Sequence, residues 1–275
     1  MRAAATPVAE ASYPLGPGAA IAPGFEVIEH LNRGRSLDTY DAWSEERDCR
    51  CVVKVPRPER LTDPRTRRRL REEGRLACSL SHPHIVRGYE LIVRPDPLLA
   101  LETIEGETLE HLVATRRRRL SAYELAHLGL HLCSAMHYLH GQGYIHLDLK
   151  PSNIVSECGR AKVIDLSLAR RPGRGRRGVG TRRYLAPEQA LGGRVSAATD
   201  VWGIGMVLFE AASARHPFAD ANGTRYPQVD GRAESIRTLR RLPAAMASAI
   251  DACLEPAAAD RPAVAELSDL LAELA

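Results

Sequence analysis

The residues with the clearest chemical potential lie in one stretch near the middle of the chain, His146-Leu147-Asp148-Leu149-Lys150-Pro151-Ser152-Asn153. In extended backbone, residues two apart share a face, so Asp148 and Lys150 can point into one site. There Asp148 could accept or orient a hydroxyl proton while Lys150 neutralises a phosphoryl group in transfer. The alternative interpretation is an ordinary polar turn that leads into a hairpin.

A hairpin after this stretch would add a metal site. Short strands are expected at Asn153–Val155 and Lys162–Asp165, with Cys158-Gly159 in the turn between them. Such a hairpin brings the amide of Asn153 and the carboxylate of Asp165 together at its open end. Amide and carboxylate oxygens suit a hard cation such as Mg²⁺.

Lysine is rare in this chain, and its positions are informative. Of the 38 lysine and arginine residues, only three are lysines: Lys54, Lys150 and Lys162. Where arginine is used nearly everywhere else, a remaining lysine can mark a site that needs a compact ammonium. Lys54 sits in an apolar strand, and Glu73 falls inside the apolar stripe of a helix expected from Pro64 to Leu80. A carboxylate on a core-facing surface needs a partner, so the two are expected to pair, either as a structural salt bridge or as a phosphate-binding device.

The remaining patterns predict a β-rich first part and a helical second part. Residues 1–24, rich in Ala, Pro and Gly, are expected to be an unstructured tail. Strands are expected at Phe25–Leu31, Asp38–Ser44, Cys49–Val55, Val86–Val93 and Leu98–Thr103. After Glu107 the main helices are expected at about Ser121–Gly141, Val195–Ala214, Met246–Leu254 and Pro262–Leu271.

Bulk composition leaves several function classes without support. The net charge is +4 over 275 residues, which demands neither nucleic acid nor a membrane surface. No apolar run is long enough to span a bilayer, and early prolines break any signal-peptide core, so a cytoplasmic location is expected. The six cysteines are scattered, and His127 and His131 have the spacing of two zinc ligands without a third.

The stretch from His146 to Asn153 resembles the catalytic loop of protein kinases, H-R-D-x-K-x-x-N, and Asp165-Leu166-Ser167 resembles the D-F-G that follows it. Val53-Lys54 and Glu73 match the strand lysine and helix glutamate of that family in order and spacing. Further matches are the hinge-like Leu101-Glu102-Thr103-Ile104, the A-P-E motif Ala186-Pro187-Glu188, Asp200-x-Trp202-x-x-Gly205, and Arg261, which should pair with Glu188.

This resemblance covers the chain from Phe25 to its C-terminus and is to the bacterial-type (Hanks-type) serine/threonine protein kinases. It implies an α+β, bilobal fold over residues 25–275, with a small β-rich lobe (25–102) and a larger helical lobe (103–275). It also implies an enzyme that transfers the γ-phosphate of ATP to serine or threonine hydroxyls of a protein substrate. Neither nucleic acid nor a membrane is expected as a partner, and no oligomeric state is indicated.

The resemblance also implies a role for each site residue. Asp148 would orient the substrate hydroxyl, Lys150 would sit on the γ-phosphate, and Thr181 would hydrogen-bond near both. Asn153 and Asp165 would carry Mg²⁺, or Mn²⁺ in its place. Nucleotide binding would fall to Lys54 on the α- and β-phosphates, with Glu73, Leu31, Gly34, Glu102 and Ile104.

The chain departs from the family pattern in its glycine-rich loop and its activation segment. Of the loop glycines only Gly34 remains, with Asn32 and Leu37 at the other two positions, which could keep the backbone from closing over phosphates. Leu147 replaces the arginine that normally clamps a phosphorylated activation segment. Between Ser167 and Thr181 there is no Ser, Thr or Tyr, so activity is expected not to depend on phosphate added there.

The same segment carries Arg170, Arg171, Arg174, Arg176 and Arg177, a basic character that could favour acidic or phosphorylated substrates. Its G-x-G-x-x-G match, Gly173–Gly178, lacks the apolar helix that a dinucleotide site requires. Two other functions stay open. The eroded glycine loop suits a pseudokinase or nucleotide-binding scaffold, and an antibiotic-phosphotransferase type of small-molecule kinase shares a similar Asp…Asn…Asp core. The A-P-E match and the expected Glu188–Arg261 pair favour a protein substrate.

Overall fold

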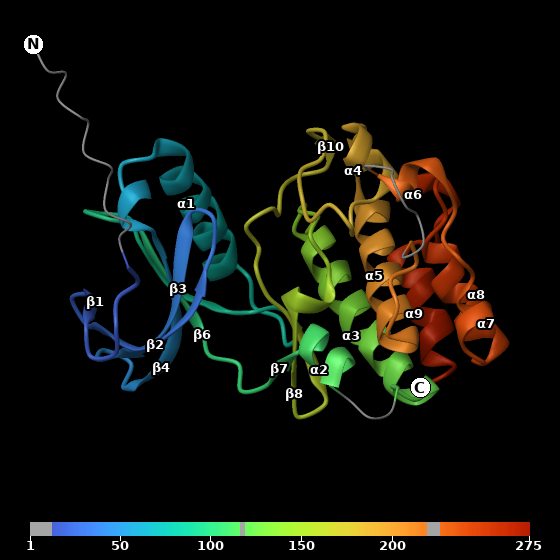
Figure 1. The fold of residues 1–275 in the computed structure, drawn as a ribbon, viewed down its shortest axis with the longest axis horizontal. Coiled ribbons are helices and arrows are strands. Elements are labelled where there is room, and N and C mark those ends of the chain that lie inside the picture. The colour runs from blue at the N-terminus through green and yellow to red at the C-terminus, as the bar shows by residue number, and fades with distance from the viewer. Residues whose placement is uncertain (1–12, 116–118, 219–225) are drawn as a thin grey trace, which may run out of the picture. The chain divides into compact units, whose positions relative to one another are not determined.

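The computed structural model describes residues 13–115, 119–218 and 226–275 (Figure 1). Within them the chain forms two compact units. The first comprises residues 13–79 and 87–103, and the second comprises 80–86 and the described residues from 104 onward. The predicted lobe boundary at 102/103 therefore lies one residue from the observed one, but residues 80–86, predicted in the first lobe, belong to the second unit.

The first unit is built on one antiparallel sheet in the order β1-β2-β3-β4-β6-β5. Its core comes from alternating side chains: in β4, Cys51 and Val53 are buried while Arg50 is exposed. Phe25, Ala42, Leu98 and Ala100 complete this apolar cluster. The strands are β1 (Ala20–Ala22), β2 (Phe25–Arg33), β3 (Leu37–Ser44), β4 (Cys49–Pro56), β5 (Gly88–Ile92) and β6 (Leu98–Glu102).

One helix of the first unit, α1 (Pro64–Ser79), packs against this sheet after the short turn η1 (Pro58–Arg60). Asp63 caps α1, because its carboxylate accepts from the backbone N of Thr66 at 3.2 Å. Helix and sheet lie very close where Gly74 meets Leu91, since a Cβ on Gly74 would stand 2.6 Å from Leu91 Cδ1. This close packing fixes the face of α1 that carries Glu73.

The prediction of an unstructured tail over residues 1–24 is wrong for its second half; residues 1–12 lie outside the described residues. β1 pairs with β2, Gly18 N donates to Val27 O at 2.8 Å, and Leu15 N donates to the Tyr40 hydroxyl at 3.1 Å. Main-chain pairing with β2 orders a segment whose own composition has no strand periodicity.

The second unit is mainly helical and is organised around α5 (Ala197–Ser213). Fourteen of the seventeen residues of α5 are buried, including Trp202 and Phe209. Gly203 and Gly205 let other segments approach, because a Cβ would stand 2.7 Å from Leu149 Cβ at the first and 2.6 Å from Cys253 Cβ at the second. The other helices are α2 (Leu109–Thr115), α3 (Ala122–Gly141), α4 (Pro187–Leu191), α6 (Pro227–Asp230), α7 (Ile236–Leu239), α8 (Ala244–Cys253) and α9 (Val264–Ala272), with the 3₁₀ turns η2 (Pro151–Asn153) and η3 (Ala258–Asp260).

Short strands shape the loops of the second unit. β7 (Glu107–Thr108) pairs with β8 (Ile154–Glu157), which forms a hairpin with β9 (Arg160–Val163). β10 (Gly173–Arg174) pairs with β11 (Arg194–Val195). The predicted hairpin with Cys158-Gly159 at its turn is confirmed, and both turn residues have positive φ. Among residues 13–115, 119–218 and 226–275, no helix combines the length and hydrophobicity needed to cross a membrane.

The start of α3 is set by a capping box. Ser121 Oγ accepts from Glu124 N at 3.1 Å, and the Glu124 carboxylate accepts from Ser121 N at 2.7 Å. Two otherwise unsatisfied donors are thereby paired at the head of a 20-residue helix that packs against α5 and α9.

Replacing Ser121 with alanine should lower the free energy of unfolding by about 1 kcal/mol, because the acceptor for Glu124 N is lost. Urea denaturation followed by far-UV circular dichroism measures the change. Ser121→Asp keeps a cap acceptor and is the matched control, expected within about 0.3 kcal/mol of wild type. An equal loss in both variants would contradict the capping role.

Candidate active site

The predicted Lys54–Glu73 pair is present in the first unit. Lys54 Nζ donates to Glu73 Oε1 at 2.6 Å. Lys54 lies on β4, and Glu73 lies on the sheet-facing side of α1 with its side chain 2% exposed. Because a buried carboxylate is costly without a counter-charge, the packing of α1 on the sheet fixes the position of the ammonium.

The glycine-poor hairpin between β2 and β3 is held by charged groups. Gly34 N donates to Leu37 O at 2.9 Å, and a Cβ on Gly34 would stand 3.2 Å from that oxygen. Beside this turn, the buried Asp38 carboxylate lies 3.3 Å from both Arg33 Nε and His30 Nε2. Arg57 N donates to Ser36 O at 3.0 Å. The Arg33–Asp38 ion pair and the His30–Asp38 contact thus fix a loop that keeps one of the three glycines of the family pattern.

The other predicted nucleotide contacts lie apart along the chain. Leu31 is on β2 and is 49% exposed. Leu101 is buried in β6, and the side chain of Glu102, at the end of β6, accepts from Arg87 N at 2.8 Å. Ile104 is the first residue of the second unit after the strand.

In the second unit, three donors converge on Asp148, which is only 9% exposed. Thr181 N donates to Oδ1 at 2.9 Å, and Lys150 Nζ donates to Oδ2 at 2.9 Å. Asn153 Nδ2 donates to Oδ2 at 3.2 Å and to the Asp148 carbonyl at 2.9 Å. Lys150 Nζ also donates to Thr181 Oγ1 at 2.7 Å. The carboxylate, the ammonium and the hydroxyl therefore form one connected group.

The β8–β9 hairpin carries the two candidate metal ligands at its ends. Ile164 N donates to Asn153 O at 2.9 Å, which joins the residues that flank the hairpin. Asp165 adopts φ 68°, a left-handed conformation that is costly for a residue with a Cβ, and its carboxylate accepts from Ser167 N at 3.3 Å. Because Asn153 Nδ2 donates to Asp148, its Oδ1 is the atom that a cation would meet. Amide and carboxylate oxygens fit Mg²⁺ in donor type.

A buried carboxylate on α5 holds the backbone just before Asp148. Asp200 accepts from His146 N, Leu147 N and His140 Nε2, each at 2.8 Å. It lies in the first turn of α5, where the helix dipole favours negative charge. These bonds secure Leu147 at φ 69°, another left-handed position. Although the spacing of Asp200 and Trp202 is visible in the sequence, nothing in the sequence shows that this carboxylate binds the backbone before Asp148.

The predicted Glu188–Arg261 pair is present and is bidentate, at 2.8 and 2.9 Å. The Arg261 side chain is fully buried and lies over the Trp202 ring, 5.0 Å from its centroid. Thr199 Oγ1 donates to the same carboxylate at 2.9 Å. This group ties α4 to α5 and to the loop before α9.

The segment from Leu166 to Ala186 is anchored at several points. Arg170 exchanges two backbone hydrogen bonds with Ile145, at 2.8 and 3.0 Å, and Gly175 N donates to Gly193 O at 2.7 Å. Gln189 Nε2 donates to Leu147 O at 2.9 Å, while its Oε1 accepts from Ala186 N at 3.2 Å. The sequence gives no signal for Gln189, because an amide beside the A-P-E motif has no distinctive spacing.

Leu147 itself contributes an apolar contact to this segment. Its side chain clusters with Ile145 and Val195, and Leu168 packs against the group. Hydrophobic packing therefore occupies the position next to Asp148 where the family pattern places an arginine.

The two histidines with the spacing of zinc ligands, His127 and His131, lie among ring and backbone contacts on α3. His131 stacks on His84 with ring centroids 4.2 Å apart, and its Nδ1 accepts from Ala161 N at 3.3 Å. Burial lowers the pKa of His131 to about 4. His127 lies farther along the same face of α3, 6.3 Å from the His131 ring.

A second polar group, missed by the sequence analysis, surrounds Tyr184. Its hydroxyl donates to Glu210 at 3.0 Å, and burial raises the pKa of Glu210 to about 7. His216 Nε2 donates to Arg183 O at 3.0 Å, and its Nδ1 accepts from Phe218 N at 3.2 Å. Burial lowers the pKa of His216 to about 4, so the neutral imidazole is the form that holds this backbone.

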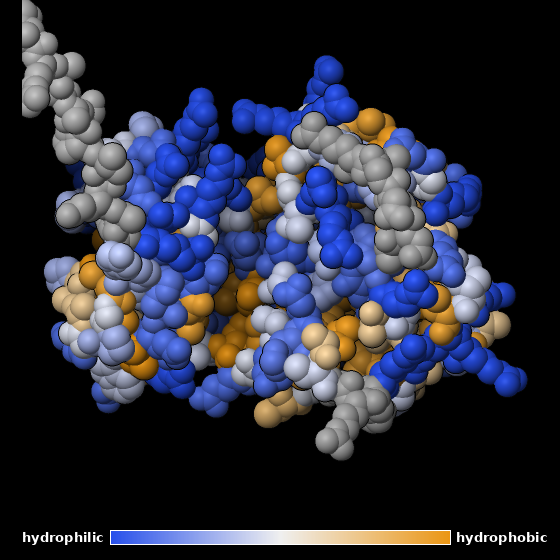
Figure 2. All heavy atoms as spheres, in the orientation of Figure 1, coloured by the Kyte–Doolittle hydropathy of each residue, from blue (hydrophilic) through white to orange (hydrophobic). Residues whose placement is uncertain are grey.

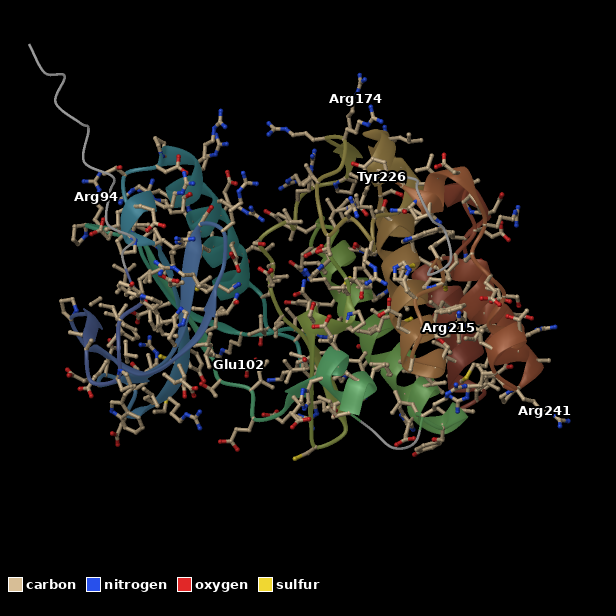
Figure 3. All side chains as sticks on the ribbon, viewed as in Figure 1. Arg94, Glu102, Arg174, Arg215, Tyr226 and Arg241 are labelled. Carbon is tan, nitrogen blue, oxygen red and sulfur yellow. The ribbon has the colours of Figure 1, made fainter. Side chains whose placement is uncertain are left out.

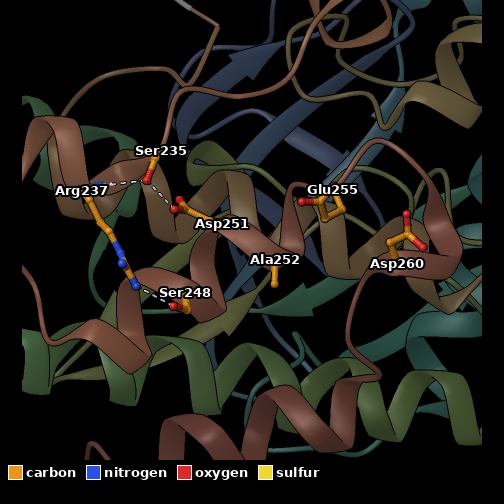
Figure 4. Close-up of a pocket in the computed structure, with 7 residues that line it drawn as sticks. All are labelled: Ser235, Arg237, Ser248, Asp251, Ala252, Glu255 and Asp260. Atoms are coloured by element: carbon orange, nitrogen blue, oxygen red, sulfur yellow. Dashed lines mark hydrogen bonds between the residues drawn. The ribbon is translucent and has the colours of Figure 1, made fainter.

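A pocket of about 650 Å³ lies elsewhere in the second unit, at α7, α8 and η3 (Figure 4). Asp251 there accepts from Ser235 Oγ at 2.5 Å and from Ile236 N at 2.9 Å, and Arg237 donates to Ser248 Oγ at 2.7 Å. None of the seven lining residues belongs to the predicted site, and these polar groups bond to one another.

Comparison with known proteins adds a family match. The model of the protein kinase domain matches residues 25–270. A probable serine/threonine-protein kinase of Streptomyces coelicolor is 31% identical over 207 residues, which cover 70% of this chain and 31% of that protein. PknB of Mycobacterium tuberculosis is 34% identical over 180 residues, which cover 61% of this chain and 29% of that protein. PrkC of Bacillus subtilis is 30% identical over 208 residues, which cover 73% of this chain and 32% of that protein.

The chain thus spans about three tenths of the length of the curated relatives it matches. Among solved structures, the PknI kinase domain of Mycobacterium tuberculosis matches 96% of this chain and 100% of its own, with a TM-score of 0.73 and 22% identity. Its C20A mutant gives a TM-score of 0.76 at the same identity. At this identity the likeness concerns the fold, and it confirms the predicted α+β, bilobal architecture.

The His216 and Glu210 groups predict opposite pH dependences. Unfolded histidine binds a proton below its ordinary pKa of 6.5, whereas folded His216 does so only near 4, so His216 lowers stability as pH falls through this window. Glu210, with its raised pKa, favours the folded state as pH falls from 7 towards 4.5. The two contributions partly cancel in the wild type.

His216→Gln should therefore gain stability relative to wild type between pH 7 and pH 5, by about 2 kcal/mol. Chemical denaturation of both proteins at the two pH values measures this difference. The exposed His137→Gln is the matched control for loss of a histidine side chain. A flat difference for His216→Gln would contradict the assignment.

Proposed function

The chain belongs to the protein kinase domain family, and from that premise we propose that it transfers the γ-phosphate of ATP to serine or threonine hydroxyls of a protein. The convergence of Lys150, Asn153 and Thr181 on the Asp148 carboxylate carries this proposal. Phosphoryl transfer needs little covalent chemistry from the protein, so catalysis depends on positioned charge. The serine/threonine kinase names of the relatives support the acceptor class.

In this proposal the substrate hydroxyl approaches Asp148, which orients it and takes its proton. A bond forms between the hydroxyl oxygen and the γ-phosphorus while the bond from that phosphorus to the β–γ bridging oxygen breaks, which releases ADP. Lys150, held by Asp148 and Thr181, would offset the negative charge on the transferring group. Because Lys150 and Thr181 are already bonded, little reorganisation is needed at the moment of reaction.

We assign the nucleotide and metal roles by residue. Lys54, fixed by Glu73, would bind the α- and β-phosphates. Asn153 and Asp165 would hold Mg²⁺, or Mn²⁺, which would neutralise charge on the β- and γ-oxygens. Leu31 and Gly34 would lie over the nucleotide, and the backbone of Glu102 and Ile104 would bond adenine. A cytoplasmic setting, with no requirement for nucleic acid or membrane, completes the proposal.

Activity is proposed to be independent of phosphate on the activation segment. The segment between Leu168 and Gly180 has no hydroxyl side chain to accept one. The apolar cluster of Leu147 with Ile145, Val195 and Leu168 would do the ordering that an arginine–phosphate contact does elsewhere. The backbone hydrogen bonds of Arg170 and Gly175 would also help to order the segment.

Asp148→Ala should lower transfer of labelled γ-phosphate to a serine-containing protein at least about 100-fold, because the group that orients the hydroxyl is lost. Transfer would be measured with Mg²⁺ and, separately, with Mn²⁺. Asp269→Ala is the matched control, since Asp269 is exposed on α9. Equal, negligible transfer by folded wild type and Asp148→Ala would contradict the kinase proposal. Nucleotide binding in that case would favour the scaffold function suggested by the glycine-poor loop.

Leu147→Ala should lower kcat by about tenfold or more, since loss of the apolar contact lets the segment beside Asp148 move. Trypsin should also cleave the arginine-rich segment faster. The exposed Leu270→Ala is the control for loss of a leucine side chain. Phosphatase treatment of the wild type should leave kcat unchanged, and activation that requires phosphate on Thr181 would contradict the proposal.

A further inference from the structure

The surface of the activation segment is unusually rich in one charge. Between Leu166 and Thr199 the chain has eight arginines and one acidic residue, Glu188. Glu188 is already bonded to Arg261. All eight arginines are exposed: Arg170, Arg171, Arg174, Arg176, Arg177, Arg182, Arg183 and Arg194. We name these eight residues the arginine surface.

Within the described part of the chain, no carboxylate forms an ion pair with any member of this surface. Hydrophilic side chains gather over β10 in the space-filling view (Figure 2). Arg174, on β10, points away from the ribbon (Figure 3). Eight like charges repel one another, so an external anion would relieve that repulsion.

The backbone beneath these arginines is firmly held, which makes the charge array a defined surface. Arg174 pairs with Arg194 across the β10–β11 ladder. Gln228 Nε2 donates to Arg182 O at 3.0 Å, and His216 Nε2 donates to Arg183 O at 3.0 Å. Gly178 N donates to Gln189 O at 3.0 Å. A fixed backbone beneath these exposed side chains reduces the entropy lost when they bind a partner.

The arginine surface adjoins the reaction centre along the chain. Arg182 and Arg183 directly follow Thr181, whose N and Oγ1 bond to Asp148 and Lys150. A peptide whose hydroxyl reaches Asp148 would therefore pass these side chains. No internal phosphate can take their place, because the segment from Leu168 to Gly180 has no hydroxyl side chain.

We propose that the arginine surface binds the anionic flanks of the protein substrate, so that acceptor serines or threonines near carboxylate or phosphate groups are preferred. This proposal rests on the proposed kinase function. Carboxylates and phosphates share the chemistry that a guanidinium recognises, paired oxygen acceptors with negative charge. Nucleic acid is less well matched, because the segment has a single aromatic residue, Tyr184, whose hydroxyl is bonded to Glu210.

The test compares four serine peptides that differ only in their flanks: glutamate-rich, phosphoserine-containing, neutral and lysine-rich. kcat/KM is measured for each at low and high salt. We expect the two anionic peptides to exceed the neutral one by tenfold or more at low salt, with the advantage shrinking at high salt. The comparison of glutamate with phosphoserine identifies which anion is preferred.

The decisive variant is R174E/R176E/R177E, which reverses charge outside the residues that contact Asp148. It should lose most of the preference for anionic peptides, gain activity on the lysine-rich peptide, and keep its activity on the neutral one. R65E/R160E/R241E reverses three exposed arginines outside the segment and should retain the wild-type order. An unchanged preference in the first variant would overturn the proposal.

Binding separates this inference from the kinase proposal. Fluorescence anisotropy of the glutamate-rich peptide on Asp148→Ala protein needs no phosphoryl transfer. Tight binding there, weakened at least fivefold by adding R174E/R176E/R177E, would support the surface even if no transfer is detected. Equal binding of anionic and neutral peptides, or preferential displacement by a single-stranded oligonucleotide of the same charge, would overturn it.

Discussion

The buried Asp200 carboxylate forms the interaction on which the loop around Asp148 depends. It stands in the first turn of α5, and three donors around it lie at 2.8 Å. Two of them are consecutive backbone amides, His146 N and Leu147 N, so the carboxylate fixes the chain one residue before Asp148. The left-handed backbone of Leu147 would be unfavourable on its own, and these bonds compensate for it. Loss of Asp200 would leave two buried amides without acceptors and release that strain.

Around Asp148 and Leu147, the site is held by both polar and apolar contacts. Asp148 holds Lys150, Asn153 and Thr181, while Leu147 on the neighbouring position packs on Ile145 and Val195. Since β11, which contains Val195, also pairs with β10, the apolar cluster and the ladder restrain neighbouring parts of the same segment. An arginine at this buried position would need an anionic partner for its charge, whereas leucine needs only packing. The absence of hydroxyl side chains between Leu168 and Gly180 agrees with this solution.

Much of this architecture is predictable because its signals are local. The stripe on α1 predicts the Glu73 partner, and the β8–β9 hairpin follows from alternation with Cys158-Gly159 at the turn. What the sequence does not show includes the bonds from side chains to distant backbone groups. Gln189 and His216 bind backbone carbonyls far along the chain, and such bonds leave no periodicity. Segment 13–24 lacks strand composition and is ordered by pairing with β2, so tertiary context overrides its local preference.

The division between lysine and arginine follows the same physical logic. Lys54 and Lys150 are each bonded to a carboxylate, at 2.6 and 2.9 Å, and Lys150 also donates to the Thr181 hydroxyl at 2.7 Å. A compact ammonium fits such positions. Two of the environments in which arginine is placed differ from these. Arg261 is buried with a bidentate carboxylate and an aromatic ring, and the activation segment displays its guanidinium groups to solvent. A planar fork suits both positions, since it pairs with two oxygens and stays charged. Replacement of exposed arginines by lysine would keep the net charge but lose this paired geometry, so the structure favours partners whose anionic groups offer two oxygens together.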